Sequence, residues 1–118
     1  MREPSRTKRP WGSYEVLDTS STHQVKRIVV RPGRRLSYQV HERRSEHWFV
    51  VEGEGVVTLD GELVVVKAGQ AVDVPVAAAH RIENTGERDL VFIEVQHGEY
   101  FGEEEESRRR EESGRSCK

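Results

Sequence analysis

Short β-branched segments separated by turn residues fill the middle of this chain, and they constrain its fold more than any other feature. The segments HQVKRIVV, EHWFVVEG, GVVTLDG, ELVVVKAG, QAVDVP and DLVFIEVQ follow one another between residues 23 and 96. Asp60-Gly61 lies between two valine-rich runs, where a type I′ hairpin turn is expected because both of its central positions need positive φ. No central window has apolar residues at helical spacing. The sequence therefore predicts an all-β sandwich or small barrel, which can enclose a cavity lined by every second side chain of each strand.

The two ends of the 118-residue chain differ from this apolar middle. We expect a flexible N-terminal arm over residues 1–8, a barrel domain over residues 9–102, and a charged tail over residues 103–118 that is helical or disordered. The net charge of −2, from 19 basic and 21 acidic residues, argues against recruitment of nucleic acid. The N-terminus has no apolar core for a signal peptide, and no apolar run approaches the roughly 18 residues of a membrane span. A single cysteine, Cys117, fits a reducing, cytoplasmic setting.

Candidate metal ligands gather just ahead of one predicted strand. Gln39 and His41 are two residues apart, so on an extended chain both point to one face. Glu46 begins the next run, and His80 follows much later in the chain. If the four converge inside a barrel, two nitrogens and two oxygens would suit a divalent ion such as Zn²⁺, and Mn²⁺ or Fe²⁺ less decisively. His47 has the opposite strand parity and should point away unless a bulge intervenes.

The spacing of these residues resembles the two motifs of the cupin family. Gly33-x5-Gln39-x-His41-x4-Glu46-x6-Gly53 is similar to the first motif, with Gln in place of its first His. Gly69-x5-Pro75-x-Ala77-x2-His80-x3-Asn84 is similar to the second, with Ala in place of a Gly. The resemblance implies a cupin-type double-stranded β-helix, a jelly-roll barrel.

A narrower resemblance, to the type II phosphomannose isomerase domain, covers nearly the whole chain. The segments that carry it are RPWGSYEVLD, VKRIVVRPGRRLSYQVH, EHWFVVEGEGVVTLDGE, AAHRIENTG and IEVQHGEYFGE. That domain is usually the C-terminal part of a bifunctional mannose-1-phosphate guanylyltransferase, and here we expect it to stand alone. The resemblance implies metal-dependent interconversion of mannose 6-phosphate and fructose 6-phosphate through an enediol. Type I isomerases also use a Gln-x-His pair with a later Glu and His as zinc ligands, which supports Gln39 as a ligand.

Two segments depart from the family pattern. The family typically has HHHRAEHW where this chain has HERRSEHW, so Glu42 and Arg43 replace two histidines. The family tail usually resembles IVRFEDRYGR, whereas this one reads ESRRREESGR, in which Arg108 matches but the aromatic anchors are gone. In the family this tail is thought to bring an arginine to the active site. The resemblance therefore assigns Arg108 to catalysis and to substrate binding.

Glu94 and His47 are the candidates for the base that moves a proton between C1 and C2. Within DLVFIEVQ, residues 90, 92, 94 and 96 share one face and residues 91, 93 and 95 share the other. If the first face lines the cavity, burial would raise the pKa of Glu94 toward neutrality; otherwise Glu94 lies on the solvated side of an ordinary strand. Lys26 and Arg108 are the candidates for holding the phosphate. Parity does not settle which way Lys26 faces, because its strand carries a charged residue on each face.

Two other functions stay open alongside the isomerase. One is a cupin enzyme of another class, such as an oxygenase with iron in the same pocket, and the other is a non-catalytic cupin that binds a sugar or nucleotide sugar. The RPWG and EHW motifs favour the isomerase over the oxygenase, while the altered tail favours the binding protein. Trp11 and Tyr14 are expected to cap one end of the barrel. The expected assembly is a homodimer formed by pairing of strand edges, which would cover edges that otherwise invite aggregation.

Overall fold

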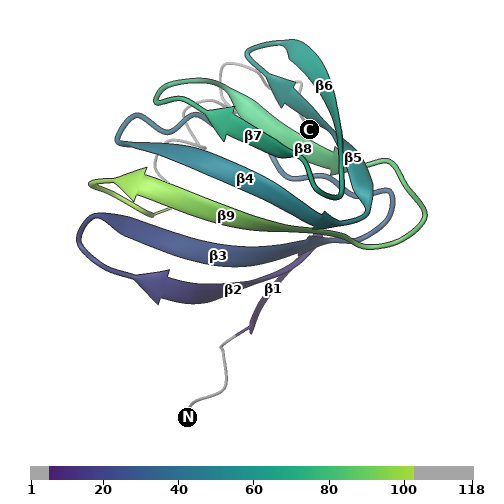
Figure 1. Cartoon of the computed structure of the whole chain (residues 1–118), viewed down its shortest axis with the longest axis horizontal. Coiled ribbons are helices and arrows are strands. Elements are labelled where there is room, and N and C mark those ends of the chain that lie inside the picture. The colour runs from purple at the N-terminus through teal and green to yellow at the C-terminus, as the bar shows by residue number, and fades with distance from the viewer. Residues whose placement is uncertain (1–5, 103–118) are drawn as a thin grey trace.

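The computed structural model describes residues 6–102, and over this range the chain forms nine strands and no helix (Figure 1). The all-β prediction is confirmed. No helix in the described range could cross a membrane. The strands are β1 (Arg6–Arg9), β2 (Gly12–Thr19), β3 (His23–Val30), β4 (Arg44–Glu52), β5 (Glu54–Leu59), β6 (Glu62–Lys67), β7 (Ala71–Val74), β8 (His80–Asn84) and β9 (Leu90–Gly98).

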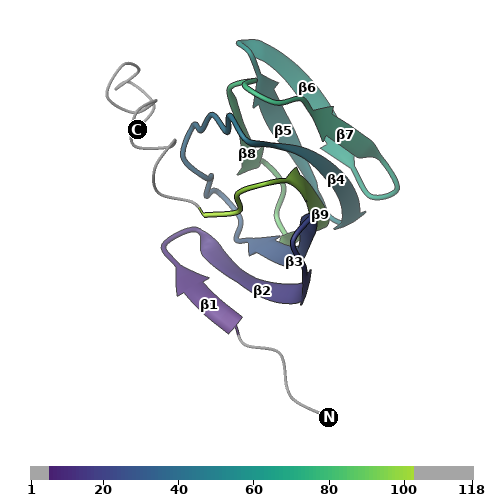
Figure 2. The same ribbon diagram turned by 90° about the vertical axis from the view of Figure 1, so that its left-hand side faces the viewer.

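The strands form two antiparallel sheets. The larger sheet has six strands in the order β1-β2-β3-β9-β4-β7, and the smaller has three in the order β6-β5-β8. The larger sheet bends along this order, so that β4 and β7 lie beside the smaller sheet (Figures 1 and 2). Strand β9 lies between β3 and β4, although β4 follows β3 in the sequence. The last strand therefore joins the N-terminal strands β1–β3 to β4 and β7 in one sheet.

The inner face of the larger sheet is divided along its strands into an apolar half and a polar half. Val30 on β3 pairs with Leu90 on β9, and both are fully buried at one end of the sandwich. Toward the other end, Lys26 on β3 pairs with Glu94 on β9, and Glu94 in turn pairs with Trp48 on β4. The apolar half continues into a core that also contains Ile28, Val50, Val57, Val66, Val74, Ile82 and Phe92. Strand alternation therefore brings polar side chains together at one end of an otherwise apolar interior.

The β5–β6 turn has the conformation that the sequence predicts. Asp60 and Gly61 have φ values of 48° and 85°, as a type I′ turn requires. This turn also contacts the segment before β8, because the Asp60 backbone N donates to the Ala79 carbonyl at 2.7 Å and Asp60 Oδ1 accepts from the Ala79 backbone N at 2.8 Å. The hairpin therefore holds the chain just ahead of His80.

The predicted N-terminal arm is wrong at its inner boundary. Residues 6–8 belong to β1, which pairs with β2 from Arg6 opposite Glu15 to Arg9 opposite Gly12. The charge of the run RTKR favours an arm, but an edge strand tolerates charge on its exposed side. The tail over residues 103–118, with Arg108 and Cys117, lies outside the described residues.

Candidate metal centre

The loop between β3 and β4 runs beside β8 and brings distant parts of the chain together. Gln39 and His80 exchange two backbone hydrogen bonds, with N–O distances of 2.9 and 2.8 Å. The His41 carbonyl accepts from the backbone N of Ala77 at 2.8 Å. Ala77 has a φ of 71°, in the left-handed region where the cupin motif usually has glycine. These contacts fix the backbones of Gln39, His41 and His80 relative to one another.

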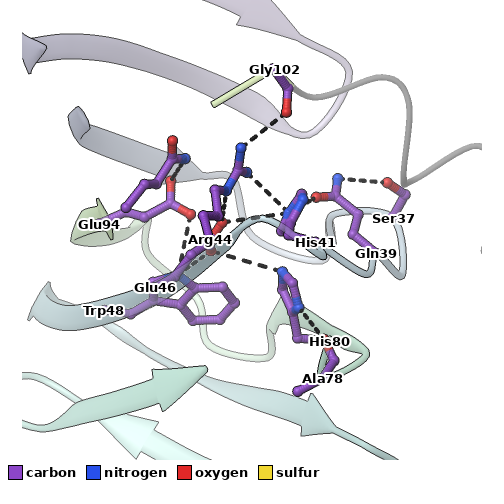
Figure 3. Close-up of polar contacts among 11 residues, drawn as sticks. Ser37, Gln39, His41, Arg44, Glu46, Trp48, Ala78, His80, Glu94 and Gly102 are labelled. Atoms are coloured by element: carbon purple, nitrogen blue, oxygen red, sulfur yellow. Dashed lines mark hydrogen bonds and ion pairs between the residues drawn. The ribbon is translucent and has the colours of Figure 1, made fainter. Parts of the chain in front are cut away.

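His41, Glu46 and His80 are buried and form a group whose ligand atoms all lie within 4.8 Å of one another. His41 Nε2 is 3.4 Å and His80 Nε2 is 3.8 Å from the Glu46 carboxylate (Figure 3). Gln39 Oε1 lies 3.1 Å from His41 Nε2, so the structure brings all four predicted ligands together. His80 Nδ1 is 2.9 Å from the Ala78 carbonyl and must donate to it, so Nε2 is the nitrogen of His80 that a metal could bind. This donor set fits a divalent ion such as zinc.

Arg44 also belongs to this cluster, and sequence reasoning missed it. Its Nε donates to Glu46 Oε2 at 2.8 Å, its Nη2 lies 3.0 Å from His41 Nε2, and its Nη1 donates to the Gly102 carbonyl at 3.0 Å (Figure 3). Arg44 has the same strand parity as Glu46, so alternation could have placed it inside, but arginines are exposed by default. A metal bound to His41 and Glu46 would need the nitrogen and carboxylate atoms that this guanidinium contacts, so Arg44 and a metal ion would compete for the same ligand atoms.

Burial and neighbouring charges set the protonation of the cluster. Burial lowers the pKa of His41 to about 3, so its imidazole is neutral at physiological pH. Burial and the adjacent charge of Glu46 raise the pKa of Glu94 well above its usual value. Burial acts against ionisation of Glu46 as well, but the hydrogen bond to Glu94 and the charges of His80 and Arg44 lower the pKa of Glu46 below its usual value. Trp48 Nε1 donates to both carboxyls, at 2.9 Å to Glu46 and 3.2 Å to Glu94. The site therefore holds one carboxylate beside one carboxylic acid.

A cavity of about 330 Å³ opens next to this cluster, and Gln39, Glu46, His80 and Glu94 all line it. Glu94 therefore lies on the cavity face of β9, one of the two orientations that the sequence left open. Lys26 also faces inward and is only 4% exposed, which answers the question that strand parity did not settle. The expected caps, Trp11 and Tyr14, are half-buried and line the same cavity.

Comparison with known proteins agrees with this geometry. Residues 2–111 match the family described as "Mannose-6-phosphate isomerase C-terminal". The chain belongs to this family. It is 44% identical over 109 residues to the alginate biosynthesis protein AlgA of Pseudomonas aeruginosa, and 42% identical over 107 residues to the mannose-1-phosphate guanylyltransferase of Escherichia coli. These matches cover 92% and 91% of this chain but only 23% and 22% of the relatives, so the chain spans less than a quarter of their length.

Comparison with solved structures identifies the fold. The crystal structure of a predicted oxalate decarboxylase from Thermotoga maritima superposes with a TM-score of 0.69 and 28% identity, covering 80% of this chain and 91% of that one. The predicted cupin-type double-stranded β-helix is thereby confirmed.

Within this family member, the remaining predicted site residues have different outcomes. His47 lies on the outer face of β4, where its side chain is 50% exposed and its Nδ1 is 2.6 Å from Asp73 Oδ1. It was a candidate base, but the structure does not bring it to the cavity, because the bulge in β4 comes later, between Val50 and Glu52. Arg108 lies outside the described residues.

Proposed function

We propose that this chain is a metal-dependent sugar-phosphate isomerase that interconverts mannose 6-phosphate and fructose 6-phosphate. The observation that carries the proposal is the donor set of Gln39, His41, Glu46 and His80 beside a cavity that Glu94 also lines. Aldose–ketose isomerisation needs an electrophile at the carbonyl oxygen and a group that moves a proton between C1 and C2. The membership of the mannose-6-phosphate isomerase C-terminal family supports the same reaction.

The proposed roles follow from position and protonation. A bound divalent ion would polarise the carbonyl and the neighbouring hydroxyl as a Lewis acid, and zinc is the ion that this mixed nitrogen and oxygen set suits best, with manganese or iron as alternatives. Glu94 lies beside the ligands, and in its carboxylate form it is the group proposed to take the proton from C2 and return it to C1. Its raised pKa favours this role, since a carboxylate whose pKa is raised is a stronger base. Lys26 and Arg108 are proposed to hold the phosphate.

A second function, a metal-free cupin that binds a sugar or nucleotide sugar, is favoured by one observation. The Arg44 guanidinium already contacts His41 Nε2 and the Glu46 carboxylate, so these ligands have a cation without a metal. In such a protein Arg44 would neutralise Glu46 permanently, and the cavity would bind its ligand through hydrogen bonds alone.

A coupled assay with purified protein and mannose 6-phosphate tests the two proposals. The protein would be loaded in turn with zinc, manganese, iron or cobalt, its metal content measured, and His80→Ala compared with His97→Ala, which removes an exposed histidine on β9. The isomerase predicts turnover that His80→Ala abolishes and His97→Ala leaves unchanged. Absence of both bound metal and turnover, with retained sugar binding, would favour the metal-free binding protein. Oxygen uptake by the iron-loaded protein would point instead to an oxygenase.

A further inference from the structure

Strand pairing gathers two cations around one aromatic ring on the side of the cavity away from the metal ligands. Tyr14 on β2 pairs with Ile28 on β3, so Lys26, two residues along β3, lies diagonally across from Tyr14 on the same face. Tyr14 pairs on its other side with Thr7 on β1, so Arg9 is its diagonal neighbour there. Lys26 Nζ lies 4.3 Å and Arg9 Cζ lies 5.3 Å from the centre of the Tyr14 ring. Arg9 Nη2 also donates to the Tyr14 hydroxyl at 3.4 Å.

The wall of the cavity around this cluster carries more basic than acidic residues. The Tyr14 ring attracts both cations through its quadrupole. Among the described residues that line the cavity, four are basic and two are acidic; these are Arg9, Lys26, Arg44 and Arg81, with Glu46 and Glu94. An excess of positive charge in a cavity with low-dielectric walls attracts an anion.

The cluster is also placed where the far end of a substrate would lie. Strand β9 separates β3 from β4, and Lys26 is offset from Glu46 by two residues along the strands, so their backbones are roughly 12 Å apart. Arg9, Tyr14 and Lys26 line both the cavity and an adjoining hollow of about 400 Å³ beside Tyr100 and Phe101, so this end has a route to solvent. A small molecule with one end at the metal ligands would place its other end among these three side chains.

We propose that Arg9, Tyr14 and Lys26 form an anion subsite that takes the phosphate of a phosphorylated sugar. The inference rests on the proposed function for the identity of the sugar phosphate, but the subsite itself is argued from the described strands. It adds Arg9 and Tyr14 to Lys26 as residues that bind the phosphate, and all three belong to the strands of the barrel. Lys26 and Arg9 provide charge, and Tyr14 holds them at a fixed separation.

Binding of inorganic phosphate to metal-free protein, measured by calorimetry at low ionic strength, tests the subsite without any turnover. Low salt is needed because screening weakens such contacts. Lys26→Met and Arg9→Met should each lower phosphate affinity at least about tenfold, since each removes a charge-assisted contact. Lys26→Arg should retain most of the affinity. The matched control is Arg27→Met, which removes a cation from the next position on β3, on the opposite face of the strand.

The outcomes separate this inference from the proposed function. Losses in Lys26→Met and Arg9→Met, with zinc affinity unchanged and Arg27→Met like wild type, would support the subsite. Failure of wild-type protein to bind phosphate, or equal affinities in Lys26→Met and Arg27→Met, would overturn it even if the protein turns over mannose 6-phosphate. The expected binding pattern without isomerase turnover would keep the subsite and remove the proposed reaction.

Discussion

The hairpin turn at Asp60 holds the residue before His80, so a change at Asp60 should reach metal binding. Asp60 Oδ1 accepts from the Ala79 backbone N at 2.8 Å, and Ala79 is only 1% exposed, so water does not readily replace a lost acceptor. Asp60→Ala would leave that N–H unsatisfied. It would also loosen the chain from which His80 projects toward Glu46.

The expected loss in the free energy of unfolding is about 2–4 kcal/mol. A buried N–H without an acceptor costs about 1–3 kcal/mol. Asp60 has a φ of 48°, and alanine in this left-handed region costs about 1 kcal/mol more, because aspartate tolerates the conformation through local hydrogen bonds. Small domains usually have about 5–15 kcal/mol of stability, so the variant should still fold. Zinc affinity should fall about tenfold, as when an outer partner of a ligating histidine is removed.

Urea unfolding of the metal-free protein and calorimetric titration with zinc measure the two effects. Asp60→Asn keeps an acceptor oxygen and suits a type I′ turn, so both quantities should stay near wild type. Asp18→Ala is the control for losing an aspartate elsewhere, since Asp18 is exposed and its Oδ2 lies 2.9 Å from His23 Nε2. Loss of stability in Asp60→Ala with zinc affinity unchanged would refute the reasoning, because the turn would then support the fold without positioning His80.

Three further predictions concern protonation, catalysis and assembly. Burial lowers the pKa of His41 from 6.5 to about 3, so stability of the metal-free protein should decline as pH falls from 6.5 toward 3, because only the unfolded chain then binds the proton. The loss should be about 2 kcal/mol at pH 5, and urea unfolding across this range should give a smaller slope for His41→Asn. Glu94→Gln should lower kcat by about 100-fold or more while metal affinity is retained, and His47→Asn should change neither quantity. Steady-state kinetics and a zinc titration measure the two. Equal losses of kcat in both variants would contradict the placement of Glu94 in the cavity and of His47 outside it. The homodimer stays a prediction: Leu63 and Val65 are 72% and 71% exposed on the edge strand β6, so Val65→Lys should shift a dimer to monomer in light scattering, and a monomeric wild type would contradict it.

Local periodicity was enough to predict most strands and the facing of several site residues. Alternation in HQVKRIVV and DLVFIEVQ matches β3 and most of β9, and the Asp60-Gly61 turn has the predicted conformation. Strand β8 carries no such signal, because HRIEN has one β-branched residue, Ile82, and is held by its neighbours. Its partners are β5 and the loop residues Arg35 and Gln39, which are distant in sequence. The convergence of His80 with His41 therefore depended on the resemblance to cupins, not on any local pattern.

Arg44 and Lys26 show a different limit of the sequence. Both lie on inward-facing positions of their strands, and both are less than 5% exposed. The sequence did not identify Arg44 as a site residue and did not decide which way Lys26 faces. The expectation that charged side chains lie in water competes with strand alternation at both positions. The competition is decided by the rest of the inner face. Glu46 lies two residues from Arg44 on the same strand and accepts a hydrogen bond from it, whereas Glu94 lies opposite Lys26 only once β9 pairs with β3.

The buried charges bear on function through their energetic cost. Burying an ion pair requires desolvation that its Coulomb attraction often does not recover, and apolar residues of similar size are frequently as stabilising or more so. The core at the other end of the same strands shows that this fold packs well with valine, leucine and phenylalanine. Placing Lys26, Arg44, Glu46 and Glu94 within one end of the interior therefore works against stability, and it is reasonable only if that end does chemistry or binds a charged ligand. The raised pKa of Glu94, which lies opposite Lys26, means that Lys26→Met leaves no buried carboxylate unpaired there, so this change should leave the free energy of unfolding unchanged or raise it while weakening phosphate binding. A protein in which Lys26 served only the fold would lose stability instead.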